Sequence, residues 1–239
     1  MSNLNAADLT IGIVGAGAMG RGIAQVSITG GMKALLFDAA DGAAAKAEEF
    51  IHGMLDRNVD KGRMEAADAE AAKSRLSVVS TLEGLAPCNL VVEAIVENIA
   101  IKQEVFTSLE KVVADDAIIA SNTSSIRIAS IAAACERKDR IAGLHFFNPV
   151  PLMRLVEVIR APHTSDKTAD TLIEIGKFMG RTPVIAKDGP GFLVNLGGRA
   201  YTTEAMRLLH EGVASPAQID AVMRDCCNFR MGPLELADL

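Results

Sequence analysis

The sequence predicts an α/β fold in which a doubly wound, largely parallel sheet precedes a smaller all-helical part. Short apolar runs with little polar alternation recur along most of the chain, a pattern typical of strands that are covered on both faces. Segments of helical composition separate most of these runs, which favours parallel strands joined by crossover helices. After residue 188 the pattern is helical throughout. We therefore expect two domains of different architecture.

The chain opens with a strand, a tight turn and a helix. TIGIVG (residues 10–15) is an apolar run that ends in glycine, and the helix-compatible residues 18–29 follow at once. KALLFD (33–38) is the second expected strand. The next segment, 41–74, is rich in Ala, Glu, Lys and Met and has a break near Lys61-Gly62. We expect a helical hairpin there.

Further apolar runs continue the expected sheet. They are LSVVS (76–80), NLVVEAIV (89–96), AIIASN (117–122) and RIAGLHFF (140–147). Two more runs, LVEVIR (155–160) and TPVIAK (182–187), can extend the sheet, and a helix from Asp166 to Gly180 separates these two runs. We place the domain boundary near Asp188–Gly191. Residues 1–188 then form the sheet domain, and residues 189–239 begin a helical domain. One of its helices has Ser215 as N-cap and Pro216 at the first position.

Composition excludes several classes of partner. The 239 residues carry 24 Lys+Arg against 30 Asp+Glu, a formal net charge of -6, so no overall positive field attracts nucleic acid or anionic lipid. The N-terminus lacks the pattern of a secretory signal, and no apolar run approaches the length needed to cross a bilayer. The four cysteines show neither metal-ligand spacing nor a disulfide framework. We expect a cytoplasmic protein without a metal site.

A glycine-rich motif lies at the first turn. Gly15, Gly17 and Gly20, with Ala18 and Met19 inside the motif, form G-x-G-x-x-G between the first strand and the first helix. Asp38 follows about 20 residues later, the spacing of a Rossmann-type dinucleotide site. The alternative, in which the glycines serve only a turn and Asp38 only caps a helix, is disfavoured because every contextual feature of the fingerprint is present.

The residue types of this motif match the chemistry of a dinucleotide. Gly15 permits the turn, Gly17 lets backbone N–H groups approach a pyrophosphate, and Gly20 lets helix and strand pack closely. A carboxylate at Asp38 can accept hydrogen bonds from the adenosine ribose. Alanines follow Asp38 where an arginine would bind a 2′-phosphate, so the sequence favours NAD over NADP.

Polar residues follow several of the later strands. Ser124 lies just after AIIASN, His145 lies in the strand AGLHFF, and Glu157 lies in the next strand, near enough in a compact fold to meet the imidazole. Asn195 is early in the first helix after the boundary. Because ligands of open α/β sheets bind at the carboxyl ends of the strands, we expect these groups to converge on one cleft.

Five motifs then occur in one order: VGAGAMGRGIAQ, LVVEAIVEN, IASNTSS, AGLHFFNPVPLMRLVEVI and DGPGFLVN. In order and spacing they resemble the L-3-hydroxyacyl-CoA dehydrogenase family, in its 3-hydroxybutyryl-CoA dehydrogenase branch, over nearly the whole chain. The resemblance implies oxidation of an (S)-3-hydroxyacyl-CoA to the 3-ketoacyl-CoA with reduction of NAD. It also implies that residues 189–239 begin a domain for substrate binding and dimerisation, and that the protein is a homodimer once this helical domain is complete.

The resemblance assigns roles residue by residue. It implies that His145 is the catalytic base, that Glu157 is its carboxylate partner, and that Ser124 and Asn195 bind the substrate oxygen. Glu97 and Lys102 match family positions at the cofactor. The four residues assigned to catalysis also have a purely structural interpretation. His145 could be a packed core residue, Ser124 a helix cap, Glu157 a solvated strand residue and Asn195 a partner of a helix end.

Positive charge at the hairpin tip is a candidate for binding coenzyme A. Lys61 and Arg63, with Lys102, could contact its phosphates, although a charged helical turn is more often simply solvated.

Two features depart from the family pattern. Gly197 and Gly198 follow Asn195 where the family usually has an arginine and bulky apolar residues, and each weakens a helix by about 1 kcal/mol relative to alanine unless it allows close packing. MGPLELADL resembles the start of a helix that continues in the family, so we expect the helical domain to be incomplete and the chain to be truncated.

Two competing functions stay open at this point. One is another NAD-dependent hydroxyacid dehydrogenase, whose catalytic group would more often be a lysine where this chain has Asn195. The other is a structural or nucleotide-binding relative without catalysis. The joint presence of Ser124, His145, Glu157 and Asn195 argues against it, because packing does not require that set.

Overall fold

An eight-stranded sheet organises the first of two units in this computed structural model, which describes residues 4–238. The units are Met1–Gly189 and Pro190–Leu239. The strands lie in the order β3-β2-β1-β4-β5-β6-β7-β8. Their bounds are β1 Thr10–Val14, β2 Lys33–Phe37, β3 Leu76–Val78, β4 Leu90–Glu93, β5 Ile118–Ser121, β6 Ile141–Phe146, β7 Leu155–Arg160 and β8 Thr182–Lys187. The largely parallel, Rossmann-type sheet expected from the sequence is confirmed.

One strand pair runs against the rest of the sheet. All neighbouring pairs are parallel except β6 and β7, which are antiparallel, so β7 and β8 run opposite to the first six strands. The reason is the connection: residues 147–154 form a short turn segment without a helix, and a parallel neighbour would need a longer crossover. The end of β6 and the start of β7 therefore lie at the same edge.

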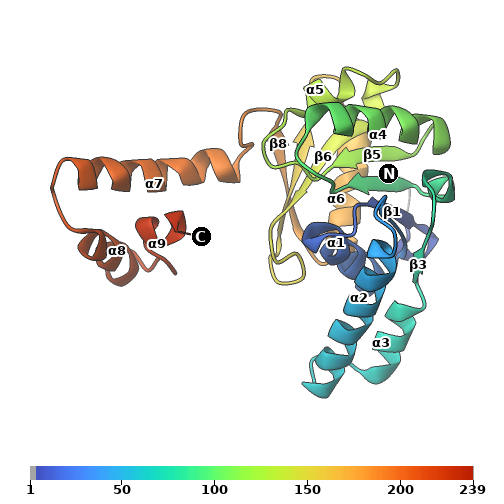
Figure 1. Ribbon diagram of the computed structural model, residues 1–239, viewed down its shortest axis with the longest axis horizontal. Coiled ribbons are helices and arrows are strands. Elements are labelled where there is room, and N and C mark those ends of the chain that lie inside the picture. Colours follow the sequence, from blue (N-terminus) through green and yellow to red (C-terminus); the bar gives the residue numbers. More distant parts are fainter. Residues whose placement is uncertain (1–3, 239) are drawn as a thin grey trace. The chain divides into compact units, whose positions relative to one another are not determined.

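Helices cover both faces of this sheet (Figure 1). Their bounds are α1 Ala18–Thr29, α2 Ala43–Asp60, α3 Ala66–Lys73, α4 Ile99–Val112, α5 Ile128–Ala132 and α6 Asp166–Phe178, with short 3₁₀ turns at Ala6–Asp8, Leu82–Leu85 and Lys138–Arg140. α1 and α6 lie on one face and approach closely, since a Cβ on Gly30 would lie 2.4 Å from the Phe178 carbonyl oxygen. α4 and α5 lie together on the other face.

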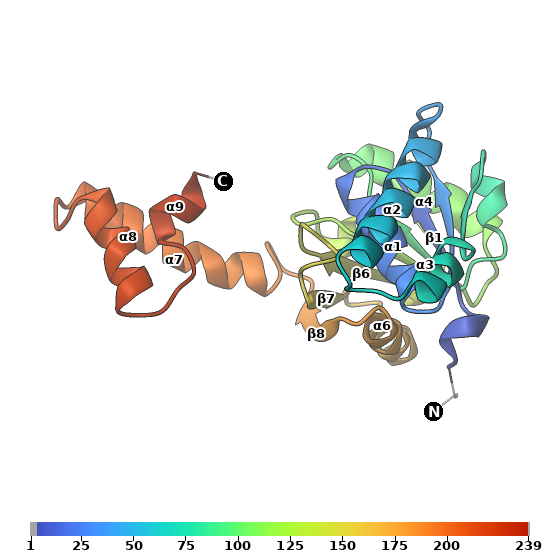
Figure 2. The ribbon, with the colours of Figure 1, turned by 90° about the horizontal axis from the view of Figure 1, so that it is seen from below.

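The expected helical hairpin is α2 and α3, which pack side by side next to α1 (Figure 2). α2 ends at Asp60, and Gly62 adopts a positive φ of 63° in the turn that follows. The apolar residues of α2 that are buried, including Ile51 and Leu55, recur at helical spacing. They join the core formed by α1 and the sheet.

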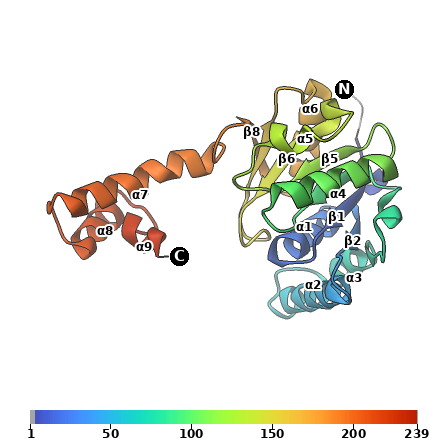
Figure 3. The ribbon, with the colours of Figure 1, turned by 45° about the horizontal axis from the view of Figure 1, so that its top comes forward.

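The described residues of the second unit, 190–238, form three helices: α7 (Val194–His210), α8 (Pro216–Asp225) and α9 (Pro233–Ala237). α9 packs against the other two (Figure 3). Ser215 and Gln218 form the capping box that starts α8, with Pro216 at its first position. Asp220 accepts a hydrogen bond from the Leu234 N–H at 2.8 Å, which fixes the start of α9 on α8. The Tyr201 hydroxyl donates to the Met231 carbonyl at 2.8 Å.

Gly197 and Gly198 lie inside α7, where a Cβ at either position would meet no atom within 4 Å. Close packing within the described residues therefore does not require glycine at these positions. No helix among residues 4–238 is both long and apolar enough to cross a membrane.

Candidate active site

The glycine motif forms a tight turn between β1 and α1. Gly15 has a positive φ of 101°, and a Cβ there would lie 2.6 Å from the Ala94 carbonyl oxygen. A Cβ on Gly20 would lie 1.7 Å from the Gly15 carbonyl oxygen, a distance no side chain can tolerate. These two glycines are therefore required by the turn and by helix–strand packing.

Gly17 differs from the other two glycines because the protein itself does not exclude a side chain there. A Cβ on Gly17 would meet no atom within 4 Å. Gly17 is the N-cap of α1, whose N-terminus has neither a side-chain cap nor an acidic residue in its first turn. The uncapped N–H groups and the positive end of the helix dipole fit an anionic group such as a diphosphate.

Asp38 follows β2 and is tied to the glycine motif. Its carboxylate accepts hydrogen bonds from the N–H groups of Ala16 (2.6 Å) and Ala40 (2.8 Å). Each carboxylate oxygen has a second lone pair that can accept from a ribose hydroxyl. A fixed negative charge at this point fits NAD and disfavours a 2′-phosphate. The residues present therefore fit an NAD molecule.

Polar side chains form a row on the sheet face that α4 and α5 cover. Glu93 is in register with Ser121 on β5, Ser121 with Gly143 on β6, and His145 with Glu157 on β7. Residues in register point to the same face, and residues two apart on one strand share it. Glu93, Ser121, His145 and Glu157 therefore lie on one face, at the edge where β4, β5 and β6 end.

His145 and Glu157 are in direct contact. The His145 Nδ1 atom lies 2.6 Å from a Glu157 carboxylate oxygen. His145 is 5% exposed and Glu157 is 0% exposed, so Glu157 is not the solvated strand residue of the alternative interpretation. The Phe147 ring lies 4.6 Å from the imidazole, centroid to centroid. A carboxylate at Nδ1 favours the tautomer with its proton there, which makes Nε2 the basic nitrogen.

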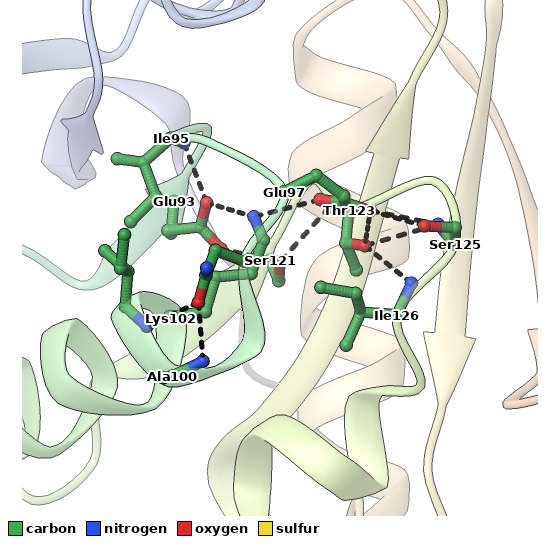
Figure 4. Close-up of polar contacts among 11 residues, drawn as sticks. Glu93, Ile95, Glu97, Ala100, Lys102, Ser121, Thr123, Ser125 and Ile126 are labelled. Carbon is green, nitrogen blue, oxygen red and sulfur yellow. Dashed lines mark hydrogen bonds and ion pairs between the residues drawn. The ribbon is translucent and has the colours of Figure 1, made fainter.

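A second polar cluster lies beside this pair and includes Glu97 and Lys102 (Figure 4). The Lys102 Nζ lies 2.6 Å from Glu93 and 3.3 Å from Glu97. Lys102 is 1% exposed, so its ammonium is committed to these carboxylates. The expectation that Lys102 offers positive charge to the phosphates of coenzyme A stays a prediction. Glu97 is 39% exposed and is the member of this group that solvent reaches most easily.

Glu97 also holds the segment that contains Ser124. Its carboxylate accepts hydrogen bonds from the Thr123 hydroxyl and from Ser125, through the Oγ at 2.8 Å and the N–H at 3.2 Å. Burial opposes ionisation of Glu97, but these hydrogen bonds and the charge of Lys102 together outweigh it and lower the Glu97 pKa. The Asn122 side-chain oxygen accepts from the Phe146 N–H at 2.8 Å and joins the same segment to β6 beside His145.

The other expected site residues lie in three places. Ser124 is exposed, between Thr123 and Ser125, and Ala18 and Met19 are in the first turn of α1. Asn195 is the second residue of α7 and belongs to the second unit. The first unit thus brings together the glycine motif with Asp38, the His145–Glu157 pair, and Glu97 with Lys102.

Of the two hairpin residues expected to bind coenzyme A, Arg63 lines a cavity and Lys61 does not. Arg63 lines a cavity of about 470 Å³ between α1, α2 and the turn after β6, together with Arg21, Phe50, Asn148 and Leu152. The Arg21 guanidinium lies 3.9 Å from the centroid of the Phe50 ring. Lys61 is exposed at the end of α2 and is absent from the described lining of this cavity. The cavity combines two cations with apolar surface, as a phosphate-bearing nucleotide requires.

The sequence did not point to Glu93 or Ser121 as members of this site. Glu93 lies in LVVEAIV, whose apolar pattern predicts a strand buried on both faces, and a carboxylate in such a strand needs a partner. Lys102 offered a further signal, because it shares the spacing i, i+4, i+7 with the buried Phe106 and Leu109. A lysine on the buried stripe of a helix predicts a buried acid nearby.

Comparison with known proteins identifies both units. The NAD binding domain of 3-hydroxyacyl-CoA dehydrogenase matches residues 10–189, and the C-terminal domain of 3-hydroxyacyl-CoA dehydrogenase matches residues 191–239. The mitochondrial hydroxyacyl-coenzyme A dehydrogenase of Sus scrofa is 45% identical over 232 residues, which are 95% of this chain and 74% of that protein. The 3-hydroxyadipyl-CoA dehydrogenase of Escherichia coli K12 is 41% identical over 230 residues, which are 96% of this chain. The chain spans 48% of the length of that protein.

Solved structures agree with these matches. The (S)-3-hydroxybutyryl-CoA dehydrogenase of Ralstonia eutropha is 40% identical with a TM-score of 0.91, and the match covers 96% of this chain and 81% of that one. The 3-hydroxybutyryl-CoA dehydrogenase of Escherichia coli is 41% identical with a TM-score of 0.94, over 98% of this chain and 49% of that one.

Proposed function

The chain belongs to the 3-hydroxyacyl-CoA dehydrogenase family of NAD-dependent oxidoreductases, and we propose that it oxidises (S)-3-hydroxybutyryl-CoA or a related (S)-3-hydroxyacyl-CoA to the 3-ketoacyl-CoA. The observation that carries this proposal is the buried contact between His145 and Glu157. It lies at the carboxyl edge of a sheet whose first turn has the geometry of a dinucleotide site.

The residues divide the work of the reaction as follows. When bound, NAD supplies the hydride acceptor. His145 takes the proton of the 3-hydroxyl group at Nε2, the general-base role that histidine most often fills in enzymes. Glu157 orients the ring through Nδ1 and stabilises the imidazolium as it forms. Ser124 and Asn195 are proposed, from their motif positions, to hydrogen-bond the reacting oxygen.

Binding of the cofactor rests on the first turn of the sheet domain. The α1 N-terminus at Gly17 would receive the diphosphate, with Ala18 and Met19 supplying backbone N–H groups, and Asp38 would bind the adenosine ribose. Glu97 and Lys102 would border the nicotinamide half. Coenzyme A would use the cavity lined by Arg21 and Arg63, whose guanidinium groups can bind phosphate oxygens. Lys61 would add charge at its rim.

Two observations disfavour the alternatives. A relative without catalysis has no use for a buried carboxylate–imidazole pair, because taking Glu157 out of water carries a desolvation cost that packing alone would avoid. A hydroxyacid dehydrogenase with a catalytic lysine would have it near the start of the helix that follows the boundary, where this chain has Asn195.

The test follows NADH absorbance when the protein is mixed with NAD and (S)-3-hydroxybutyryl-CoA. We expect turnover with the (S) enantiomer and at least a hundredfold less with the (R) enantiomer, since one face of C3 must meet the nicotinamide while its hydroxyl meets His145. Absence of turnover in the presence of NAD binding would contradict the proposal. A series of acyl-chain lengths would then define the substrate.

We also propose a homodimer formed through the helical unit. Several apolar side chains of this unit are exposed: Leu196, Met206, Leu209, Val213, Val222 and Phe229. Exposed apolar groups gathered on a small unit favour association with a second protein surface. Sedimentation equilibrium of a protein with the whole helical domain checks this, with an expected mass twice that of one chain.

We propose a cytoplasmic location because the cysteines are free thiols. Cys88, Cys135, Cys226 and Cys227 are all free thiols, and a reducing compartment keeps thiols in that form. Localisation of a tagged chain by cell fractionation tests this assignment.

A further inference from the structure

Glu93 is a fully buried carboxylate that the proposed reaction does not use. It is the last residue of β4 and is 0% exposed. One carboxylate oxygen accepts from the Lys102 ammonium at 2.6 Å and from the Ile95 N–H at 2.7 Å. The other accepts from the Ser121 hydroxyl at 2.7 Å. A carboxylate buried this completely persists only if hydrogen-bond donors satisfy it, and here each oxygen has at least one donor.

The contacts of Glu93 fit a carboxylate that accepts hydrogen bonds at both oxygens. An ammonium and a backbone N–H can only donate, so the oxygen they share must accept from both. The Ser121 hydroxyl oxygen itself accepts from the Thr123 N–H at 3.1 Å, which orients its own proton toward Glu93. Glu93 and Lys102 therefore form a charged pair inside the sheet domain.

Lys102 also forms an ion pair with Glu97 and so connects Glu93 to Glu97. Its Nζ lies 2.6 Å from Glu93 and 3.3 Å from Glu97, so one buried ammonium joins two carboxylates (Figure 4). Glu93 holds Lys102 in place, since the shorter contact is to the carboxylate that is fixed by two other donors. The ion pair with Lys102 then positions Glu97, because Glu93 already fixes the Lys102 ammonium.

The last link is the segment Thr123–Ser125, which follows β5. Glu97 accepts from the Thr123 hydroxyl and from the Ser125 Oγ and N–H. Thr123 in turn accepts from the Ile126 N–H at 2.9 Å. The residues on both sides of Ser124 are thus fixed by Glu97, and through Lys102 by Glu93.

We propose that Glu93 is a positioning residue for catalysis: acting through Lys102 and Glu97, it fixes the Thr123–Ser125 segment and so holds Ser124 at the reacting oxygen. The anchoring of the segment stands on the contacts above. Its effect on turnover rests on the proposed function. A misplacement of about 1 Å in a positioned group can cost on the order of a hundredfold in rate, so the anchor has a measurable consequence.

The first experiment measures amide hydrogen exchange of Ser125 and Ile126, without substrate, in the wild type and in Glu93→Gln. The glutamine oxygen can still accept a hydrogen bond from Lys102 but carries no charge, so Lys102 is held less firmly at the place where it meets Glu97, and the segment loosens. We expect exchange at Ser125 and Ile126 to accelerate about tenfold or more. Unchanged exchange in Glu93→Gln would overturn the proposal.

Glu110→Gln is the matched control. Glu110 lies near the other end of α4, where its carboxylate accepts from the N–H groups of Glu136 (2.9 Å) and Arg137 (2.7 Å) near the buried Arg140. The same substitution there removes a comparable acid from the same unit and leaves the Thr123–Ser125 segment untouched. Equal acceleration at Ser125 and Ile126 in this variant would show general destabilisation and overturn the proposal.

The second experiment is a double-mutant cycle on turnover. We expect Glu93→Gln to lower kcat about tenfold with a smaller change in KM, and to change kcat less than about twofold when Ser124→Ala is already present. Additive effects would show that Glu93 does not act through Ser124. An inactive wild type would contradict the proposed function, whereas the exchange experiment would still decide whether Glu93 anchors the segment.

A second variant covers the case in which Glu93→Gln fails to fold. Glu93→Leu combined with Lys102→Met removes both charges, which is less damaging than leaving one buried charge without its partner. Glu97 then loses the ammonium that holds it, so exchange at Ser125 and Ile126 must still accelerate about tenfold. Wild-type protection in a folded double variant would overturn the proposal.

Discussion

The imidazole of His145 lies against the carboxylate of Glu157, with 2.6 Å between Nδ1 and the nearer oxygen, because the two residues are register partners on the antiparallel strands β6 and β7. Strand pairing thus fixes the geometry of the His145–Glu157 pair, because both residues lie on regular strands and neither lies on a loop. Both residues are buried, which strengthens the electrostatic interaction between the carboxylate and a developing imidazolium.

This relationship predicts a large kinetic effect at His145. We expect His145→Gln to lower kcat by about 10²- to 10⁴-fold, the usual contribution of a general base, and to leave the Kd for NAD within about threefold. Stopped-flow turnover and calorimetric titration with NAD measure the two quantities. The exposed His163 supplies the control, since His163→Gln should retain wild-type turnover. A kcat for His145→Gln close to that of the control would remove His145 from the mechanism.

The open space at Gly17 predicts a selective loss of cofactor binding. Gly17→Ala places a methyl group where no protein atom lies within 4 Å, so the fold accepts it, but the group would occupy the space that the diphosphate needs. We expect the Kd for NAD to rise about tenfold or more with little change in Tm. Calorimetric titration and thermal unfolding monitor the two effects.

Gly53→Ala is the matched control for this substitution. Gly53 is inside α2, and a Cβ there would also meet no atom within 4 Å. Because alanine favours a helix interior over glycine by about 1 kcal/mol, this variant should raise Tm and leave the Kd for NAD unchanged. A Gly17→Ala protein that binds NAD as tightly as Gly53→Ala would exclude the glycine motif as the diphosphate site.

The architecture could be predicted because each element has a local signal. Gly15, Gly17 and Gly20 with Asp38 define the first strand, turn and helix, and the residues of 41–74 define the hairpin by composition and a central glycine. The antiparallel direction of β7 has no such signal within its own residues. It follows from the short segment 147–154, which leaves no room for a crossover helix.

The contacts of Glu93 could not be predicted from the sequence, for a different reason. Glu93 and Ser121 are 28 residues apart in sequence, and they meet because β4 and β5 are neighbours in register. The helical spacing of Lys102 with Phe106 and Leu109 indicates that this lysine is buried, but no local pattern shows that Glu93 and Ser121 meet. The resemblance of motifs supplied Glu97 and Lys102, whereas their partner Glu93 required the strand order.

The lowered pKa of Glu97 predicts a pH-dependent contribution to stability. Its folded-state pKa lies below the ordinary value for glutamate, about 4.3, so its contribution is present above that value and is lost as pH falls through the folded-state pKa. We expect the Tm difference between wild type and Glu97→Gln to be largest near pH 6 and to shrink below about pH 4. The sign of this trend is the test, since a difference that grows in acid would mean a raised pKa.

An exposed acid on the same helix supplies the comparison for Glu97. Glu104 lies on the solvent side of α4, and its side chain is far less constrained. Glu104→Gln should change Tm by a small and nearly constant amount over the same pH range. If both variants followed the same curve, the effect would come from net charge and not from the contacts of Glu97 with Thr123, Ser125 and Lys102.

The four cysteines divide by burial, which predicts their reactivity in the native protein. Burial raises the pKa of Cys88 to about 12 and that of Cys135 to about 11, so neither forms the reactive thiolate near pH 8, whereas Cys226 and Cys227 are exposed. We expect iodoacetamide at pH 8 to label Cys226 and Cys227 and to spare the other two. Peptide mass spectrometry reads each site separately.

The same labelling experiment in denaturant separates the two units. Cys88 and Cys135 belong to the first unit, and Cys226 and Cys227 belong to the second. Because a buried thiol reacts when its surroundings open, labelling of Cys88 and Cys135 reports unfolding of the sheet domain alone. We expect NAD to shift this labelling to higher denaturant concentration, since a ligand that binds the folded state stabilises it. Rapid labelling of Cys88 without denaturant would contradict its buried position next to Gly12 on β1.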